Sequence, residues 1–425
     1  MTELTSRPDL VASTGAVARR GLYERLVLDA LSAMTAGCLH LELPCGKVMI
    51  IGTPGAEVNA RIRVLDPAFF QKCVLFGDVG FGESYVARDW ETDSIERVIA
   101  WAILNVDNSP AMSGSKVHSV MLNLLKSYNR VQYLLRPNSL STSRRNIAEH
   151  YDLGNEFYRL WLDESMTYSS AYYTGPDQSL ESAQVAKYDA ICRKLQLRAS
   201  DHVLEIGSGW GGFASHAVRN YGCQVTTVTI SDAQLAYARL RFEREGIADR
   251  AEVQLADYRT LTGQYDKIAS IEMMEAIGDQ YLETYFAKIH ELLKPAGLVA
   301  VQYITVPDSR HDELKRGVDW IQKHIFPGSL LLSVARVNQA LNRTGDLFLH
   351  DLEDMGASYA KTLHAWWERF NAHRADVQAL GFDATFVRKW NYYLQYCEAA
   401  FASRNISVVQ AVYTRPNNRG LHRAW

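Results

Sequence analysis

An apolar segment that runs directly into a glycine-rich turn constrains the fold of this chain more than any other feature. Residues 203–206 read Val-Leu-Glu-Ile, and glycines follow at positions 207, 209, 211 and 212. Glycine has no Cβ, so the backbone of such a turn can approach a bound ligand closely. A strand, a glycine turn and then a helix are typical of the opening unit of a nucleotide-binding α/β sheet.

Strand-like and helix-like segments alternate after this turn. We expect strands at 225–230, 253–255, 268–271 and 298–306, and helices at 213–218, 233–244 and 280–293. This alternation predicts a mostly parallel, doubly wound sheet. After Pro307 the sequence predicts a helical, aromatic-rich region up to a last strand at 407–413.

The preceding third of the chain differs in composition. Residues 1–20 are expected to form a loose tail, and 21–108 a small α+β domain. In that domain we expect a helix at 22–34, strands at 40–43, 48–51 and 60–65, and a chain broken by glycines at 77, 80 and 82. Residues 109–146 contain basic but no acidic residues, and apolar side chains recur at three- and four-residue steps. This linker is expected either to pack on the protein or to meet anionic lipid headgroups, and 147–425 to form the catalytic domain.

Composition excludes several classes of protein. The 425 residues carry 48 acidic and 45 basic side chains, so a chain that is basic throughout and binds nucleic acid is not expected. No apolar run is long enough to span a bilayer, and the first 20 residues lack a secretory pattern. The six cysteines form no CxxC pair, and no histidine pair has metal-ligand spacing, so we expect reduced thiols, a cytoplasmic location and no metal.

One alternative for the glycine turn is a dinucleotide site. Gly207, Gly209 and Gly212 satisfy GxGxxG, and Asp232 follows at the distance where a ribose-binding acid is expected. That motif is weak evidence when it stands alone.

Three features favour S-adenosylmethionine (SAM) instead. Glu205 opens an E-x-G-x-G-x-G pattern, and Asp257 and Tyr258 end the third strand, where an acid can face an adenine edge. Residues 292–298 form a helix stop that leads into a strand late in the sheet, which is familiar in class I methyltransferases. Because these separate sites agree, the sequence favours SAM over a dinucleotide.

Further strings extend the pattern along the chain. They are Ala-Glu-His-Tyr-Asp-Leu-Gly-Asn at 148–155, Met-Thr-Tyr-Ser at 166–169, Thr-Ile-Ser-Asp-Ala-Gln at 229–234, Asp-Tyr-Arg at 257–259, the segment 271–278, and Phe-Pro-Gly at 326–328. With them the chain resembles the family of cyclopropane-fatty-acid synthases and mycolic-acid-cyclopropane synthases. The resemblance implies a class I SAM-methyltransferase fold with helical insertions. It also implies a small lipid-handling domain at the N-terminus, where 81–85 and Trp90 carry the likeness.

The resemblance implies a reaction on lipids. In this family SAM gives a methyl group to a cis double bond in a phospholipid acyl chain, and proton loss from the resulting carbocation closes a cyclopropane ring. Proton loss elsewhere gives a methyl- or methylene-branched chain. The partner would be phospholipid at the inner face of the membrane, met peripherally, by a chain that could form a homodimer. A small-molecule methyltransferase, and a lipid-binding protein without turnover, stay open as alternatives.

The resemblance also assigns cofactor contacts. Gln234, and not Asp232, would take the ribose hydroxyls. The full set, with four positions added from the strand-and-turn pattern, is Tyr168, Ser169, Glu205, Gly207, Gly209, Gly211, Thr229, Ile230, Gln234, Asp257 and Tyr258.

The catalytic assignments follow in the same way. Glu275 matches the family's site carboxylate, Ile304 and Tyr359 match residues around a bicarbonate that serves as general base, and Cys397 matches a cysteine often assigned to the site. None of this chemistry needs the thiol.

Two positions depart from the family pattern. Ser170 stands where relatives commonly have cysteine, and Gln302 stands where they have histidine. Serine and glutamine can still donate hydrogen bonds, so both are kept as candidate site residues. The sequence leaves open whether bicarbonate binds, and a changed base leaves open the branched product.

Overall fold

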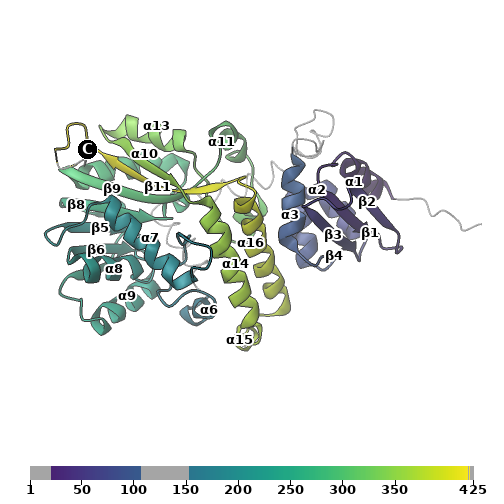
Figure 1. The fold of residues 1–425 in the computed structure, drawn as a ribbon, viewed down its shortest axis with the longest axis horizontal. Helices are drawn as coiled ribbons and strands as arrows, with labels where there is room; N and C mark the ends of the chain where they lie inside the picture. The colour runs from purple at the N-terminus through teal and green to yellow at the C-terminus, as the bar shows by residue number, and fades with distance from the viewer. Residues whose placement is uncertain (1–20, 107–152, 420, 422–425) are drawn as a thin grey trace, which may run out of the picture.

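The computed structural model describes residues 21–106, 153–419 and 421, which form two units, each built around a sheet (Figure 1). The predicted tail at 1–20 and the basic linker at 109–146 lie outside the described residues. Both therefore stay predictions. No helix in the described part of the chain is long and apolar enough to cross a bilayer.

The larger unit contains a seven-stranded sheet in the order β10-β11-β9-β8-β5-β6-β7. Five strands are parallel: β5 (His202–Ile206), β6 (Gln224–Thr229), β7 (Ala251–Leu255), β8 (Tyr265–Ile271) and β9 (Leu293–Thr305). At one edge β11 (Ser407–Thr414) pairs antiparallel with β9, and β10 (Phe348–Asp354) pairs antiparallel with β11. The predicted doubly wound α/β class is confirmed.

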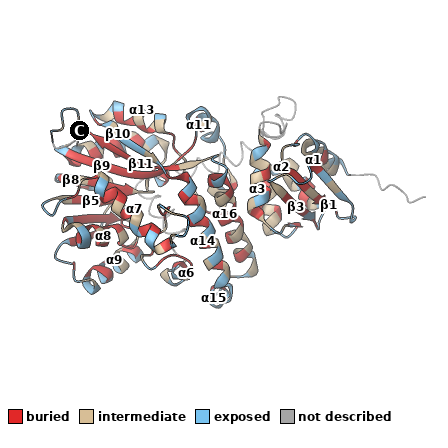
Figure 2. Cartoon of the chain, in the orientation of Figure 1, coloured by how far each residue is buried: buried red, intermediate tan, exposed pale blue. Residues whose placement is uncertain are grey.

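Helices cover both faces of this sheet, and the strands are buried between them (Figure 2). Alternate residues of β5 divide between two hydrophobic clusters, Val203 in one and Leu204 in the other, as the two-residue period of a strand requires. One cluster includes residues of α7 (Leu180–Lys194), α8 (Gly212–Tyr221) and α9 (Asp232–Arg244). The other includes residues of α10 (Leu282–Leu292) and α13 (Val334–Thr344).

Further helices lie between the large sheet and the small unit (Figure 1). The long α14 (Gly356–Ala372) and α16 (Ala384–Ala402) pack against each other, with α15 (Arg374–Ala379) between them in the chain. Shorter elements complete the unit: α6 (Asn155–Arg159), η2 (Tyr258–Thr260), η3 (Met274–Ala276), η4 (Asp279–Tyr281), α11 (Asp308–Leu314) and α12 (Trp320–His324).

The small unit has a four-stranded sheet in the order β2-β1-β3-β4. Its elements are α1 (Leu22–Ser32), β1 (Cys38–Glu42), β2 (Val48–Gly52), β3 (Asn59–Val64), α2 (Ala68–Val86), β4 (Trp90–Glu91) and α3 (Ile95–Leu104). It contacts the larger unit through α16 and α12. The Arg388 guanidinium donates to the backbone oxygen of Tyr85, and the Gln395 side chain accepts from the N–H groups of Ile95 and Glu96.

Two sequence expectations were wrong. The segment after Pro307 contains β10, which was not predicted because this edge strand is largely exposed and lacks a buried alternating face. Gly80 and Gly82 do not break the chain but lie inside α2, where only Gly77 has a non-helical backbone. A Cβ on Gly82 would lie 2.4 Å from the Trp320 ring, so the glycine is needed for close packing.

Candidate active site

A cavity of about 400 Å³ opens where β5, β6, β8 and β9 end, and parts of α14 and α16 complete its wall. Ligands of open α/β sheets bind at the carboxyl ends of the strands, so the cavity lies where the fold favours a site. The predicted site residues that line it are Tyr168, Ser169, Glu205, Gly207, Gly209, Thr229, Ile230, Gln234, Asp257, Tyr258, Glu275, Ile304, Tyr359 and Cys397.

The glycine turn forms one wall. Gly207 and Gly209 have φ of 97° and 47°, in the left-handed region that favours glycine. The backbone N–H groups of Gly207 and Ser208 both donate to the Val228 carbonyl, which ties the turn to β6. This wall of the cavity is therefore formed by backbone atoms of glycines that carry no side chain, and hydrogen bonds to β6 hold it in place.

Gly211 does not line the cavity, although it was predicted to contact the cofactor. Its φ is 85°, and a Cβ there would lie 2.9 Å from the Phe242 ring on α9. The glycine at this position serves the packing of α9 against the turn.

The polar groups near this turn fit SAM. Glu205 is buried and lines the cavity, so its carboxyl group can meet a polar group of SAM. Burial raises the pKa of Glu205 to about 8. Gln234 is also buried and lines the cavity, and it accepts a hydrogen bond from Thr229, whereas Asp232 is exposed. SAM, bound among these residues, supplies an electrophilic methyl group on a sulfonium.

The opposite side of the cavity carries hydroxyl groups. The Tyr168 hydroxyl lies 2.7 Å from that of Tyr393 on α16. The Ser169 hydroxyl accepts from the buried Lys187 ammonium at 2.7 Å. Burial lowers the pKa of Lys187 to about 7, even though nearby carboxylates oppose the shift.

Asp257 and Tyr258 follow β7, as expected. Both oxygens of Asp257 accept from the Arg259 guanidinium, at 2.8 and 2.6 Å, so this carboxylate is held in a bidentate ion pair. The Arg259 guanidinium also lies 5.6 Å from the centre of the Tyr258 ring.

Glu275 lies in η3, just beyond β8. Its Oε1 accepts from the Ile304 backbone N–H at 2.6 Å, while its Oε2 is buried without a partner. Burial, and then the charge of Glu272, raise the pKa of Glu275 to about 8. This carboxyl is therefore largely protonated at neutral pH.

Glu272 also lines the cavity, although no sequence motif predicted a role for it. Its Oε1 accepts from the Ser170 backbone N–H at 2.8 Å and from the Gln302 amide at 2.7 Å. Its Oε2 accepts from the Tyr359 hydroxyl at 2.8 Å. A carboxylate placed directly after the apolar end of β8 was the signal that could have revealed it, since burying such a group is costly without a role.

Ser170 and Gln302 do not line the cavity, although both were predicted to be catalytic. Both are completely buried, and the Glu272 carboxylate takes a hydrogen bond from each. They hold Glu272 and do not face the cavity themselves.

Cys397 lines the cavity from α16. Burial raises its pKa, so the thiol stays protonated and is a poor nucleophile. The structure gives it the role of a small wall residue. Several neighbours are apolar and lengthen the non-polar part of the wall: Phe326, Leu331, Leu363, Ala400 and Phe401.

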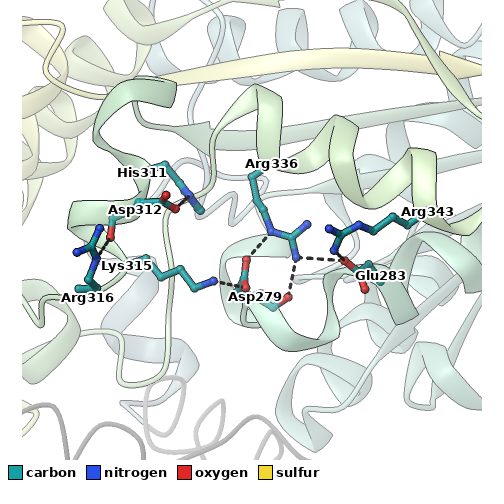
Figure 3. Close-up of polar contacts among 8 residues, drawn as sticks. All are labelled: Asp279, Glu283, His311, Asp312, Lys315, Arg316, Arg336 and Arg343. Carbon is teal, nitrogen blue, oxygen red and sulfur yellow. Dashed lines mark hydrogen bonds and ion pairs between the residues drawn. The ribbon is translucent and has the colours of Figure 1, made fainter.

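An ion cluster supports the segment that carries Glu275 (Figure 3). Asp279, four residues later, accepts from Arg336 on α13 at 2.6 Å and from Lys315, which directly follows α11. Arg336 also approaches Glu283 on α10. The segment between β8 and α10 is thus tied to two other helical regions. Among the described residues no group of three or more metal-ligating side chains is placed to hold an ion.

The doubly wound sheet, its bare glycine turn and the polar groups beside it define a SAM-dependent methyltransferase of class I. A family model described as mycolic acid cyclopropane synthetase matches residues 138–411. The chain belongs to this family, and it is an enzyme of the cyclopropane synthase type.

Two curated relatives match most of the chain. The tuberculostearic acid methyltransferase UfaA1 of Mycobacterium tuberculosis is 37% identical, over 95% of this chain and 92% of its own. The cyclopropane-fatty-acyl-phospholipid synthase of Escherichia coli K12 is 36% identical, over 88% of this chain and 93% of its own. The crystal structure of mycolic acid cyclopropane synthase CmaA1 complexed with SAH and CTAB has a TM-score of 0.60 at 29% identity. It covers 64% of this chain and 98% of that one.

Proposed function

We propose that this enzyme transfers the methyl group of SAM to the cis double bond of an unsaturated acyl chain in a membrane phospholipid. One observation carries the proposal. A single cavity joins the glycine turn and its polar groups to an apolar, aromatic wall, and the carboxyl groups of Glu272 and Glu275 lie in it. A small polar substrate would not need that apolar wall.

The chemistry explains why these residue types belong together. The alkene π electrons form a bond to the methyl carbon, and the carbon–sulfur bond breaks with its electrons going to sulfur. A carbocation is left on the acyl chain. Aromatic rings attract a cation, and Tyr168 and Tyr359 line the cavity. A carboxylate can then accept the proton whose loss ends the reaction.

The extent of the comparisons supports a phospholipid substrate. The relative named for phospholipid matches 88% of this chain, so the match must extend into the small unit. A relative named cyclopropane mycolic acid synthase 2, from Mycobacterium bovis, matches 62% of the chain yet 92% of its own length. We infer that the small unit serves the phospholipid form of the substrate.

Cyclopropane closure is the first candidate product, in line with the name of the E. coli relative. A methyl- or methylene-branched chain is the second. It is supported by the replacement of the expected histidine and cysteine by Gln302 and Ser170, and by the similarity to UfaA1. Ring closure takes a proton directly from the transferred methyl group. A methylene branch forms when a hydride first shifts between the two former alkene carbons, and a saturated methyl branch then also needs a two-electron reductant.

The first test is expression in a host that makes unsaturated phospholipids. We expect acyl chains heavier by one CH2 group, and NMR of the purified fatty acid then separates a ring from a methylene or methyl branch. Glu275→Gln should lower this yield strongly, since an amide cannot ionise when a cation forms beside it, whereas the Glu275 carboxyl can. No new lipid mass with the wild type would reject the proposal, and full activity of Glu275→Gln would remove Glu275 from the mechanism.

Access to the substrate is part of the same proposal. We infer a cytoplasmic enzyme that meets the inner face of the membrane peripherally and forms a homodimer. Sedimentation with anionic vesicles and light scattering test these two points. Methylation of soluble substrates with none on vesicles would favour a small-molecule methyltransferase instead.

A further inference from the structure

Glu272 has a backbone conformation that glutamate rarely adopts. Its φ is 48°, in the left-handed region, where a side chain is strained and glycine is not. Strain of this kind persists where the surrounding structure holds it, and such positions cluster at functional sites. Here the strained residue carries a carboxylate that lines the cavity.

Three donors converge on that carboxylate, and each comes from a different part of the fold. They are the Ser170 N–H at 2.8 Å, the Gln302 amide at 2.7 Å and the Tyr359 hydroxyl at 2.8 Å. Ser170 precedes α7, Gln302 lies on β9 and Tyr359 on α14. A group held by so many elements is positioned far more firmly than a surface glutamate.

Hydrogen bonds on the side away from Glu272 fix the orientation of the Gln302 amide. Its Oε1 accepts from the Gln410 amide on β11 at 3.1 Å, and the Gln410 Oε1 accepts from Lys194 at 2.7 Å. Because the Gln302 oxygen is occupied on that side, its NH2 group is left to donate to Glu272.

We propose that Glu272 is the proton acceptor of the reaction and takes, with the chain's own carboxylate, the place that relatives fill with bicarbonate. This inference rests on the proposed function. Tyr359 stands at a position that the family resemblance places beside bicarbonate, and Ser170 and Gln302 replace the cysteine and histidine of relatives. All three donate to Glu272. The cage is therefore full, and a separate bicarbonate does not fit it.

The carboxyl groups of Glu272 and Glu275 differ in how many donors stabilise their charged forms. Three donors stabilise the charged form of Glu272, whereas Glu275 has only the Ile304 N–H and an unpartnered oxygen. Burial raises the pKa of Glu272, and its three donors together with the charge of Lys187 oppose that rise. Of the two carboxyl groups, Glu272 therefore has the better stabilised charged form.

The step balances without any further reactant. A C–H bond beside the carbocation breaks, its proton passes to a Glu272 oxygen, and its electron pair forms either the third bond of the ring or a C=C bond. The carboxylic acid then releases its proton to water. Hydrogens next to a carbocation are strongly acidic, so a carboxylate is a sufficient base.

The first experiment measures binding and needs no substrate. Carbon-13-labelled bicarbonate is titrated into the wild type and into Glu272→Gly, and line broadening is followed by NMR. Glycine suits φ of 48°, so this variant should fold, which a thermal melt checks. We expect no binding to the wild type and binding to the variant, whose cage is empty. Equal binding to both proteins would overturn the proposal, whatever lipid the enzyme methylates.

The second experiment measures turnover in buffer depleted of carbon dioxide. Wild-type activity should not change when bicarbonate is restored. Glu272→Gln should lose roughly 100-fold or more, the usual effect of removing a positioned base, without recovery. Glu272→Gly should lose as much but regain activity with bicarbonate. Glu243→Gln, an exposed change on α9, is the matched control.

The outcomes separate the two proposals. A wild type that needs bicarbonate, or a fully active Glu272→Gln, would overturn the role of Glu272 while leaving lipid methylation intact. A wild type without lipid activity would instead reject the proposed function, and the binding titration would still decide whether Glu272 fills the cage.

Discussion

At the scale of single residues, two glutamates three positions apart have different surroundings. Glu272 is held by three donors, while Glu275 receives one N–H from Ile304 and leaves a buried oxygen without a partner. An unsatisfied buried carboxyl is costly to ionise, which is why the pKa of Glu275 rises to about 8. At any pH at which the unfolded chain would ionise this carboxyl, burying it lowers the free energy of unfolding.

This predicts a pH-dependent gain for Glu275→Gln. The folded wild type keeps a proton that the unfolded chain releases above its ordinary pKa of 4.5, so stability falls between about pH 5 and pH 8. Glutamine cannot ionise, so the variant should become relatively more stable across this window. The gain is a few kcal/mol at most, because one pKa unit corresponds to about 1.4 kcal/mol. Urea unfolding at pH 5 and pH 8 measures it, and an equal difference at both values would contradict the raised pKa.

Most of this site could be predicted from the sequence, because a parallel sheet brings the residues at its strand ends and in the glycine turn to the same edge. The sequence could not predict Glu272, whose importance comes from donors on three distant segments. Nor could it show that Ser170 and Gln302 would be shielded from the cavity by that side chain. Gly211 illustrates the same limit: its pattern fits a cofactor contact, but its neighbour is Phe242.

At the scale of elements, the parallel strands were predictable because burial on both faces gives continuous apolar runs. The edge strand β10 was not, since its exposed acidic residues resemble those of a loop. The segment from Glu275 to α10 was also hard to predict, since ion pairs and not an apolar face hold it. Asp279 holds this segment through ion pairs with Arg336 and Lys315 (Figure 3).

Asp279→Asn should therefore loosen this segment. Burial alone would raise the pKa of Asp279, but the hydrogen bonds from Lys315 and Arg336 outweigh it and lower the pKa. We expect a loss of about 1–3 kcal/mol in unfolding free energy, because Arg336 keeps its charge with a weakened partner. The loss should be present at neutral pH and disappear as the pH falls through the lowered pKa of Asp279.

The control lies in the same cluster. Arg343 pairs with Glu283, but its side chain is 59% exposed, so Arg343→Ala should cost about 0.5 kcal/mol or less. Methyl-transfer rates should fall for Asp279→Asn and not for Arg343→Ala, since only Asp279 holds the segment that carries Glu275. Equal effects of the two variants on the free energy of unfolding and on turnover would show that the ion pairs of Asp279 do not hold the segment.

At the scale of the whole molecule, the small unit and the catalytic unit are joined by apolar packing, by ion pairs of Glu83 with Lys323 and His324, and by polar contacts on α16. Arg388 donates to the Tyr85 carbonyl at 2.6 Å, and its guanidinium lies 4.0 Å from the centre of the Tyr85 ring. Gln395 caps the first turn of α3 by accepting from the N–H groups of Ile95 and Glu96. These contacts give the small unit a fixed position beside the helix that also contributes Cys397 to the cavity.

This coupling predicts how the molecule unfolds. In calorimetry the wild type should unfold in one transition, which SAM shifts to higher temperature because it binds only the folded state. The double variant Arg388→Met with Gln395→Leu leaves donors and acceptors of the interface unpaired, so the transition should split in two. SAM should then shift only the part that belongs to the catalytic unit. Arg244→Met, an exposed change on α9, should behave as the wild type. A single transition in the double variant, or a shift of both parts by SAM, would mean that other contacts couple the units.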